Sequence, residues 1–162
     1  MKRNQSIFSA FLAVLALLLI LGGCATQPPR YSCSMTVEEL SGQIRSSISF
    51  GMMFEQPASD LEAATGLKAS YFSEVAAYMP SRVGSDTLII GKLADDARME
   101  DVETALKAHL DNLIKTFETY LPEAYEMAKK GQIVQRGDYV MLVVSPDNDK
   151  AIELFEAAIQ PQ

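Results

Sequence analysis

Cys24 is the residue whose type and surroundings most clearly predict a chemical reaction. It ends the tetrapeptide Leu21-Gly22-Gly23-Cys24, in which an apolar residue and two small residues precede the thiol. This pattern resembles a bacterial lipobox, in which the cysteine thiol is joined to diacylglycerol through a thioether and the chain is cut before the cysteine. We therefore expect cleavage between Gly23 and Cys24, with lipidated Cys24 as the new N-terminus.

The segment before Cys24 has the composition of an export signal. Lys2 and Arg3 are basic, and residues 7–21 form an apolar run. This run is short for a membrane span, because a helix needs ~20 apolar residues to cross a bilayer. We predict a cleaved lipoprotein signal peptide over residues 1–23. Two alternatives stay open, an ordinary signal peptide cut near Ala25 and an uncleaved anchor.

Lipidation would place the mature protein on the extracytoplasmic face of the cell membrane. Two acyl chains anchor a protein stably, because each buried methylene contributes ~0.8 kcal/mol. Residues 24–35 are mostly polar and contain two prolines, which favours a short, partly stiff tether. Residues 36–162 are long enough to form a single domain with its own core. The membrane, reached through the lipid on Cys24, is the first predicted partner.

The charge of the chain excludes one class of partner. The formal net charge is −7, from 14 basic and 21 acidic residues. Removing residues 1–23 takes away two basic residues and no acid, which leaves 12 basic residues and a net charge of −9. Nucleic-acid-binding domains need a basic surface, so we predict no nucleic-acid partner. A domain lying flat on anionic lipid is disfavoured for the same reason.

Cys33 is the second of the two cysteines. If Cys24 forms a thioether, Cys33 has no partner within the chain and is free, capped or paired between chains. No CxxC motif is present, so we interpret Cys33 as an inert residue of the tether rather than a redox group. If Cys24 is not lipidated, a Cys24–Cys33 disulfide becomes the alternative.

His109 is the only histidine, so any histidine-dependent triad or metal site would have to include it. It lies three residues after Leu106 and four before Leu113, at the edge of an apolar helical stripe. This position favours a core or boundary histidine with its nitrogen satisfied over a catalytic base. HExxH, GxSxG, SxxK and glycine-rich phosphate loops are absent. We therefore assign no catalytic residue, no metal ligand and no cofactor.

Three tyrosines, Tyr120, Tyr125 and Tyr139, are the candidates for a binding surface. A tyrosine combines a large apolar ring with a polar tip, which suits recognition. Tyr120 lies off the main apolar stripe, and Tyr125 follows Pro122, so one of them could reach a groove beside a hairpin. The alternative, which we favour, is that the three rings seal the contact between sheet and helices.

Apolar periodicity and cap residues predict the order helix, short helix, strand, strand, long helix, strand, strand, helix. A capping box, Thr36-Val37-Glu38-Glu39, precedes the first helix. The predicted helices span about 37–47, 59–66, 97–121 and 148–159, with a further turn over 123–130, and the predicted strands span 72–79, 87–93, 132–135 and 138–145. Two hairpins separated by a long helix indicate an α+β fold, with an antiparallel sheet of about four strands and helices on one face.

Several of these residues also resemble a known family. They are Phe117-x-x-Tyr120-Leu121-Pro122-Glu123-x-Tyr125, then Gly137-x-Tyr139 and Val143-x-Ser145, with an earlier hairpin over Val75–Pro80 and Leu88–Lys92. The pattern resembles a family of small lipoproteins of uncharacterised function from clostridial-type Gram-positive bacteria, over roughly Val37 to Ser145. The resemblance implies an exported, lipid-anchored domain, and it supplies no reaction and no catalytic residues.

Taken together, these patterns predict a lipid-anchored extracytoplasmic module that acts by binding, with another envelope protein as the expected partner. Such a module would carry a contiguous exposed apolar patch. The alternative is a module for a small ligand, such as a metal, a peptide or a cell-wall fragment, with polar groups converging in a pocket. A hydrolase that uses two of the 21 acids is less favoured, because nothing in the sequence selects a pair.

Overall fold

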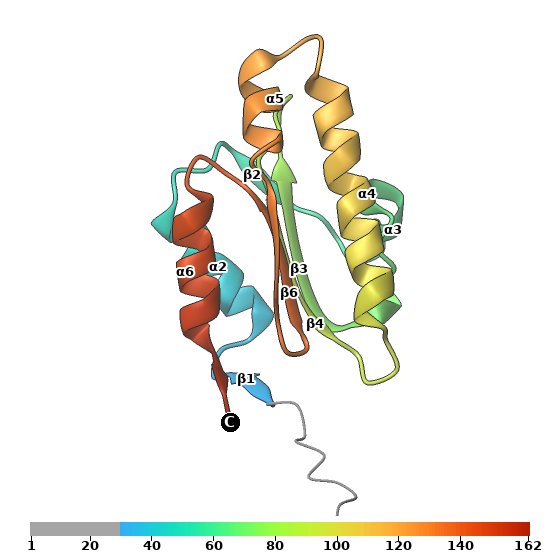
Figure 1. The fold of residues 1–162 in the computed structure, drawn as a ribbon, viewed down its shortest axis with the longest axis vertical. Helices are drawn as coiled ribbons and strands as arrows, with labels where there is room; N and C mark the ends of the chain where they lie inside the picture. The colour runs from blue at the N-terminus through green and yellow to red at the C-terminus, as the bar shows by residue number, and fades with distance from the viewer. Residues whose placement is uncertain (1–29) are drawn as a thin grey trace, which may run out of the picture.

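The computed structural model describes residues 30–162 and shows an α+β fold around a five-stranded antiparallel sheet (Figure 1). The sheet has the strand order β2-β3-β4-β6-β5, built from β2 (Met53–Glu55), β3 (Phe72–Pro80), β4 (Thr87–Leu93), β5 (Gln132–Arg136) and β6 (Tyr139–Val144). The two predicted hairpins, β3–β4 and β5–β6, are confirmed, and β4 pairs with β6 to join them. The short edge strand β2 was not predicted.

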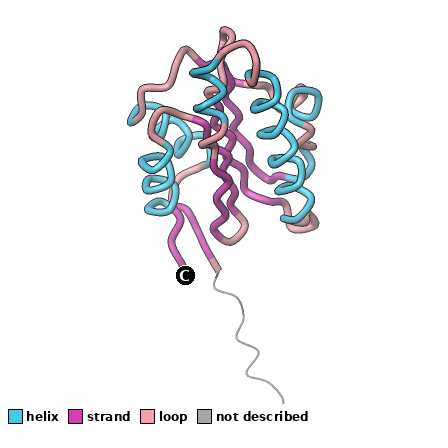
Figure 2. Tube along the Cα trace, turned by 45° about the horizontal axis from the view of Figure 1, so that its top comes forward, coloured by secondary structure: helices cyan, strands magenta, loops and turns pink. Residues whose placement is uncertain are grey.

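The helices cover both faces of the sheet, so the prediction of helices on one face was wrong. They are α2 (Val37–Ser47), α3 (Leu61–Thr65), α4 (Met99–Phe117), α5 (Pro122–Ala128) and α6 (Asn148–Ala158), with a 3₁₀ turn η1 at Ala69–Tyr71. Figures 1 and 2 show α2 and α6 on one side of the sheet and α3 and α4 on the other. Each side has its own buried core.

The reason for this two-sided cover lies in β6. All six of its residues are buried, because Tyr139, Met141 and Val143 face one core while Val140, Leu142 and Val144 face the other. A strand whose successive side chains are all apolar has no face suited to water. Helices must therefore pack on both sides of the sheet.

Hydrogen bonds to side chains fix the start of α2 relative to β3. The capping box at Thr36 is confirmed, with the Glu39 amide donating to the Thr36 hydroxyl at 3.2 Å and the Thr36 amide donating to the Glu39 carboxylate at 2.9 Å. The Val37 amide donates to the Glu74 carboxylate on β3 at 3.0 Å. The start of α2 is thereby fixed to the sheet by both a local cap and a tertiary contact.

The long predicted helix ends earlier than expected. Residues 97–121 were predicted to be one helix, whereas α4 stops at Phe117 and α5 begins at Pro122. Leu121 has φ −138° and ψ 85°, outside the helical region, because the proline ring disfavours a helical residue before it. Pro122 then occupies the first turn of α5, where its missing N–H costs nothing.

A second, two-stranded sheet joins the two ends of the described chain. β1 (Tyr31–Cys33) pairs antiparallel with β7 (Ile159–Pro161), and Figure 2 shows this ribbon outside the main sheet. β1 lies within residues 24–35, the range predicted as a tether, so the folded part begins earlier than residue 36. Tyr31 also packs beside Gly137, whose φ of +58° forms the turn between β5 and β6.

Residues 1–29, which contain the predicted signal peptide, lie outside the described part of the chain. Within residues 30–162, the helices are too short or too polar to cross a bilayer.

Candidate functional site

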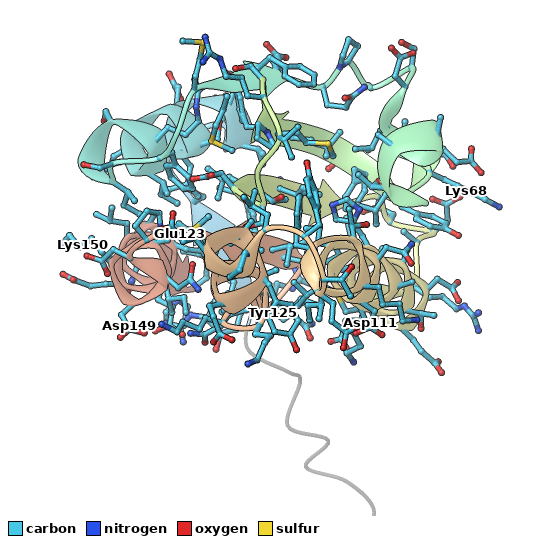
Figure 3. All side chains as sticks on the ribbon, turned by 90° about the horizontal axis from the view of Figure 1, so that it is seen from above. Lys68, Asp111, Glu123, Tyr125, Asp149 and Lys150 are labelled. Carbon is cyan, nitrogen blue, oxygen red and sulfur yellow. The ribbon has the colours of Figure 1, made fainter. Side chains whose placement is uncertain are left out.

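A groove of about 610 Å³ runs between α3 and α4. Figure 3 shows the two helices from above, with Lys68 beside α3 and Asp111 on α4 at the same side of the molecule. Its size is that of a typical small-molecule site, ~300–1,000 Å³. The groove is lined by Glu62, Ala63, Ala64, Thr65, Gly66, Tyr71, Asp101, Thr104, Ala105, Ala108, His109 and Asn112.

Buried residues at both ends of α3 hold one wall of the groove in place. Leu61 and Leu67 are fully buried in the core shared with α4. The Thr65 hydroxyl donates to the Leu61 carbonyl at 2.7 Å and accepts from the Leu67 amide at 3.1 Å. Gly66 ends the helix with φ +79°, a conformation that favours glycine. The short helix therefore presents Glu62, Ala63 and Ala64 to solvent on a fixed backbone.

The other wall comes from the face of α4 next to its buried stripe. Val102 and Leu106 face the core. The residues just before them, Asp101 and Ala105, line the groove opposite α3. Small side chains, Ala105 and Ala108, leave the space that the groove occupies. The Asp101 carboxylate is held by the Arg98 guanidinium, with Nη2–Oδ1 at 2.7 Å and Nε–Oδ2 at 2.9 Å.

His109 lies where the groove wall meets the core. Its side chain is 9% exposed, and its Nε2 is buried with no hydrogen-bond partner among residues 30–162. The expected burial is confirmed, while Nε2 lacks the hydrogen-bond partner that was expected for a buried ring nitrogen. Burial lowers the pKa of His109 below its ordinary value of 6.5, so the ring is neutral at pH 7. A neutral imidazole has one donor nitrogen and one acceptor nitrogen, and the enclosed Nε2 is out of reach of a ligand in the groove.

The hydroxyl groups of the groove are not activated for attack. The Thr104 hydroxyl donates to the Glu100 carbonyl at 2.8 Å, and the Thr65 hydroxyl donates to the Leu61 carbonyl. Neither hydroxyl is hydrogen-bonded to His109. Within residues 30–162, no group of three histidine, cysteine, aspartate or glutamate residues is placed to hold a metal ion. Neither threonine hydroxyl is therefore held by a side-chain base.

The three tyrosines chosen from the sequence lie in different surroundings. Tyr139 is buried in the core under α2 and α6. Tyr125 is half-buried on α5, with the Lys129 ammonium 4.8 Å from its ring centroid, and Figure 3 shows it between α4 and α6. Tyr120 is 59% exposed and stacks on Phe117, with ring centroids 6.3 Å apart. None of the three lines the groove.

The predicted lipidation and cleavage residues, Cys24 and Gly23, lie outside the described residues. Cys33 lies in β1, is half-buried, and packs against the core under α2 and α6.

Sequence reasoning missed most of the groove. His109 was singled out in advance. Most of the other lining residues were not, because α3 and α4 come together through tertiary packing that no local pattern encodes. One signal was present, since Ala63, Ala64, Ala105 and Ala108 place small residues on both helices. Small residues on facing helices leave room for either close packing or a groove.

Replacing His109 with leucine is expected to stabilise the ligand-free protein by about 1 kcal/mol, because an unpartnered buried polar atom costs ~1–3 kcal/mol. The melting temperature by circular dichroism would rise by a few degrees. His109→Gln, which keeps a polar group, is the control and should not stabilise. A leucine variant less stable than the glutamine variant would show that the ring makes a stabilising hydrogen bond.

The advantage of His109→Leu is expected to grow as the pH falls from 7 towards 5. The folded protein binds the His109 proton less tightly than the unfolded chain, so protonation below about pH 6.5 favours unfolding of the wild type only. The other titratable groups facing the groove, Glu62, Tyr71 and Asp101, are common to both proteins and cancel in the difference. A pH-independent difference in melting temperature would contradict this assignment.

The comparisons with known proteins identify a family and no function. Residues 46–145 match a domain of unknown function, DUF4358. This range covers β2 to β6 and includes both walls of the groove. No curated protein and no solved structure matches the chain. The match spans more than half of the sequence and confirms the expected membership of an uncharacterised family, so the chain belongs to the DUF4358 domain family.

Proposed function

We propose that this protein is a lipid-anchored, extracytoplasmic binding module that holds a small polar ligand in the groove between α3 and α4. The observation that supports this choice most directly is the groove itself, where polar side chains from two helices, including Glu62, Asn112 and His109, line one space of about 610 Å³. Small-molecule sites are usually concave, with a few polar groups that converge on the ligand. A small polar ligand would be held by hydrogen bonds to these groups.

The anchoring part of the proposal rests on the sequence before the fold. The lipobox pattern at residues 21–24 ends shortly before β1 begins at Tyr31. A lipid on Cys24 would therefore hold the domain close to the outer face of the cell membrane. The clostridial-type lipoprotein resemblance points to the same location.

Cys24→Ala is expected to abolish acyl labelling and to move the protein from the membrane fraction to the soluble fraction. Without the thiol no thioether can form. Only the apolar run over residues 7–21, which is short for a membrane span, would remain to hold the protein at the membrane. Cys33→Ala is the matched control, and it should leave labelling unchanged. Lipid labelling that persists in Cys24→Ala would refute the lipobox assignment.

The ligand-binding part can be tested with the full-length protein and a panel of metals, sugars, cell-wall fragments and peptides. A ligand at a hundred times its dissociation constant stabilises the folded state by ~2.7 kcal/mol. Ala108→Trp should remove this stabilisation, because an indole ring at the exposed groove position Ala108 fills the space. Ala157→Trp adds the same ring at an exposed position on α6 and should bind normally. A ligand that stabilises both variants equally would place its site outside the groove.

A second candidate function, recognition of another envelope protein, is favoured by exposed apolar side chains near β2. Met52, Phe54 and Val83 are 72%, 46% and 66% exposed. The Ser81 amide donates to the Met52 carbonyl at 2.8 Å, which joins the start of β2 to the turn that carries Val83. Figure 1 shows this region away from β1, where the chain enters the fold. A partner at this surface would lie on the side of the domain remote from the anchor.

A further inference from the structure

The polar side chains of the groove share one property that limits its ligands. Two of them, Glu62 and Asp101, are acidic, and no lysine or arginine lines the groove. The other polar groups, Tyr71, Thr104 and Asn112, each carry an oxygen that can accept a hydrogen bond. The full chain has a net charge of −7, which adds to the negative potential. An anionic ligand would therefore meet no lysine or arginine in the groove lining, since Arg98 is paired with Asp101 and Lys68 lies over the ring of Tyr71.

Glu62 is the carboxylate that is available to a ligand. Asp101 uses both of its oxygens to bind Arg98. Glu62 belongs to none of the ion pairs found within residues 30–162, and its side chain is exposed on α3. A cation in the groove can therefore pair with Glu62 without displacing an existing partner.

Tyr71 supplies an aromatic ring that already attracts a cation. The Lys68 ammonium lies 5.9 Å from the Tyr71 ring centroid. Cations are attracted to the negative face of an aromatic ring at such distances. The same ring lines the groove, where it is half-buried next to the acidic and amide side chains.

We propose that the groove selects ligands that carry a protonated primary amine over anionic and N-acylated ones. An ammonium group has three N–H donors and no acceptor, so it needs three acceptors around it. Glu62 provides the countercharge, and the oxygens of Thr104 and Asn112 provide further acceptors. His109 lines the same groove, and its neutral ring adds no positive charge that would repel the ammonium group. This inference rests on the proposed function, because it names the ligand class of the same groove.

The test compares amines with their N-acetyl derivatives on the full-length protein. Glucosamine and cadaverine are the probes, N-acetylglucosamine and N,N′-diacetylcadaverine are their matched partners without a free amine, and glucosamine 6-phosphate tests added negative charge. Calorimetric titration should show that N-acetylation of glucosamine weakens binding at least tenfold, and raising the salt concentration should weaken binding of the amine.

Glu62→Gln should weaken amine binding about two- to fivefold, which is the range for one exposed ion pair. Glu123→Gln is the control, because it removes the same charge from α5. Figure 3 shows Glu123 away from α3, so this variant should leave binding unchanged. Ala108→Trp should abolish binding altogether, because the indole ring obstructs the groove.

Two results would overturn this inference while leaving the proposed function intact. One is an acetylated or phosphorylated probe that binds as well as the amine and is blocked by Ala108→Trp. The other is the absence of amine binding while some other ligand class still binds in the groove. Amine binding that survives Ala108→Trp would overturn the inference as well, because the amine site would then lie elsewhere.

Discussion

Phe155→Ala is expected to lower the free energy of unfolding by about 3–5 kcal/mol, the usual cost of removing a buried phenyl ring. Phe155 is fully buried on α6, in the core that α2 and α6 form with one face of the sheet. Domains of this size are stable by only ~5–15 kcal/mol, so the variant would lose a substantial part of the original stability. Urea denaturation followed by circular dichroism measures the change.

Leu106→Ala provides the comparison on the opposite face. Leu106 is also fully buried, but it belongs to the core between α4 and the other side of the sheet. We expect a loss of about 2–5 kcal/mol. If helices covered only one face, as the sequence had suggested, one of the two substitutions would cost little. A loss below about 1 kcal/mol for Phe155→Ala would show that α6 does not pack as described.

Gly91→Ala is expected to cost about 1–3 kcal/mol by overpacking, although alanine is a mild substitution elsewhere. The Phe72 ring lies directly over Gly91, so a Cβ at that position would overlap the ring atoms Cδ1 and Cε1. Gly91 is in the middle of β4, where Val75 of β3 and Val140 of β6 are its cross-strand partners. The backbone is hydrogen-bonded on both sides and cannot move away.

Shortening the facing side chain tests this explanation. Phe72→Leu alone should destabilise, because it leaves a gap over Gly91. Combined with Gly91→Ala, it should cost less than the sum of the two single changes, since the new methyl group enters the space that the ring has left. Strict additivity in the double variant would mean that the cost of Gly91→Ala has another source.

Local signals in the sequence predicted most of the elements of this fold. The capping box gave the start of α2, and the apolar run Thr87–Leu93 gave β4 with its observed bounds. The edge strand β2 was missed because it is only three residues long and its residues show no clear alternation of apolar and polar side chains. The second helical layer was missed although β6 is apolar at every position. An unbroken apolar strand indicates cover on both faces, and this pattern should have outweighed the count of hairpins.

The candidate site was much less predictable than the fold. His109 was noticed for its rarity, but a sequence cannot show that Nε2 is enclosed without a partner. Glu62 and Tyr71 lie far from His109 along the chain, and only the packing of α3 against α4 brings them to one groove. The tyrosines were chosen for their chemistry, which says nothing about whether a ring ends in the core or at the surface.

The small sheet of β1 and β7 has a mechanical consequence. Three residue pairs and the bond from the Gln162 amide to the Arg30 carbonyl, at 2.8 Å, tie both ends of the described chain together at one pole. A force applied through the segment before residue 30 therefore acts on this ribbon before it acts on the main sheet. Opening the ribbon uncovers Ile159 and Cys33, which pack in the core under α2 and α6, but it leaves the core under α3 and α4 intact, because no residue of β1 or β7 belongs to that core. It is the first point of yielding under tension, and it shields the groove from forces that reach the domain through its N-terminal end.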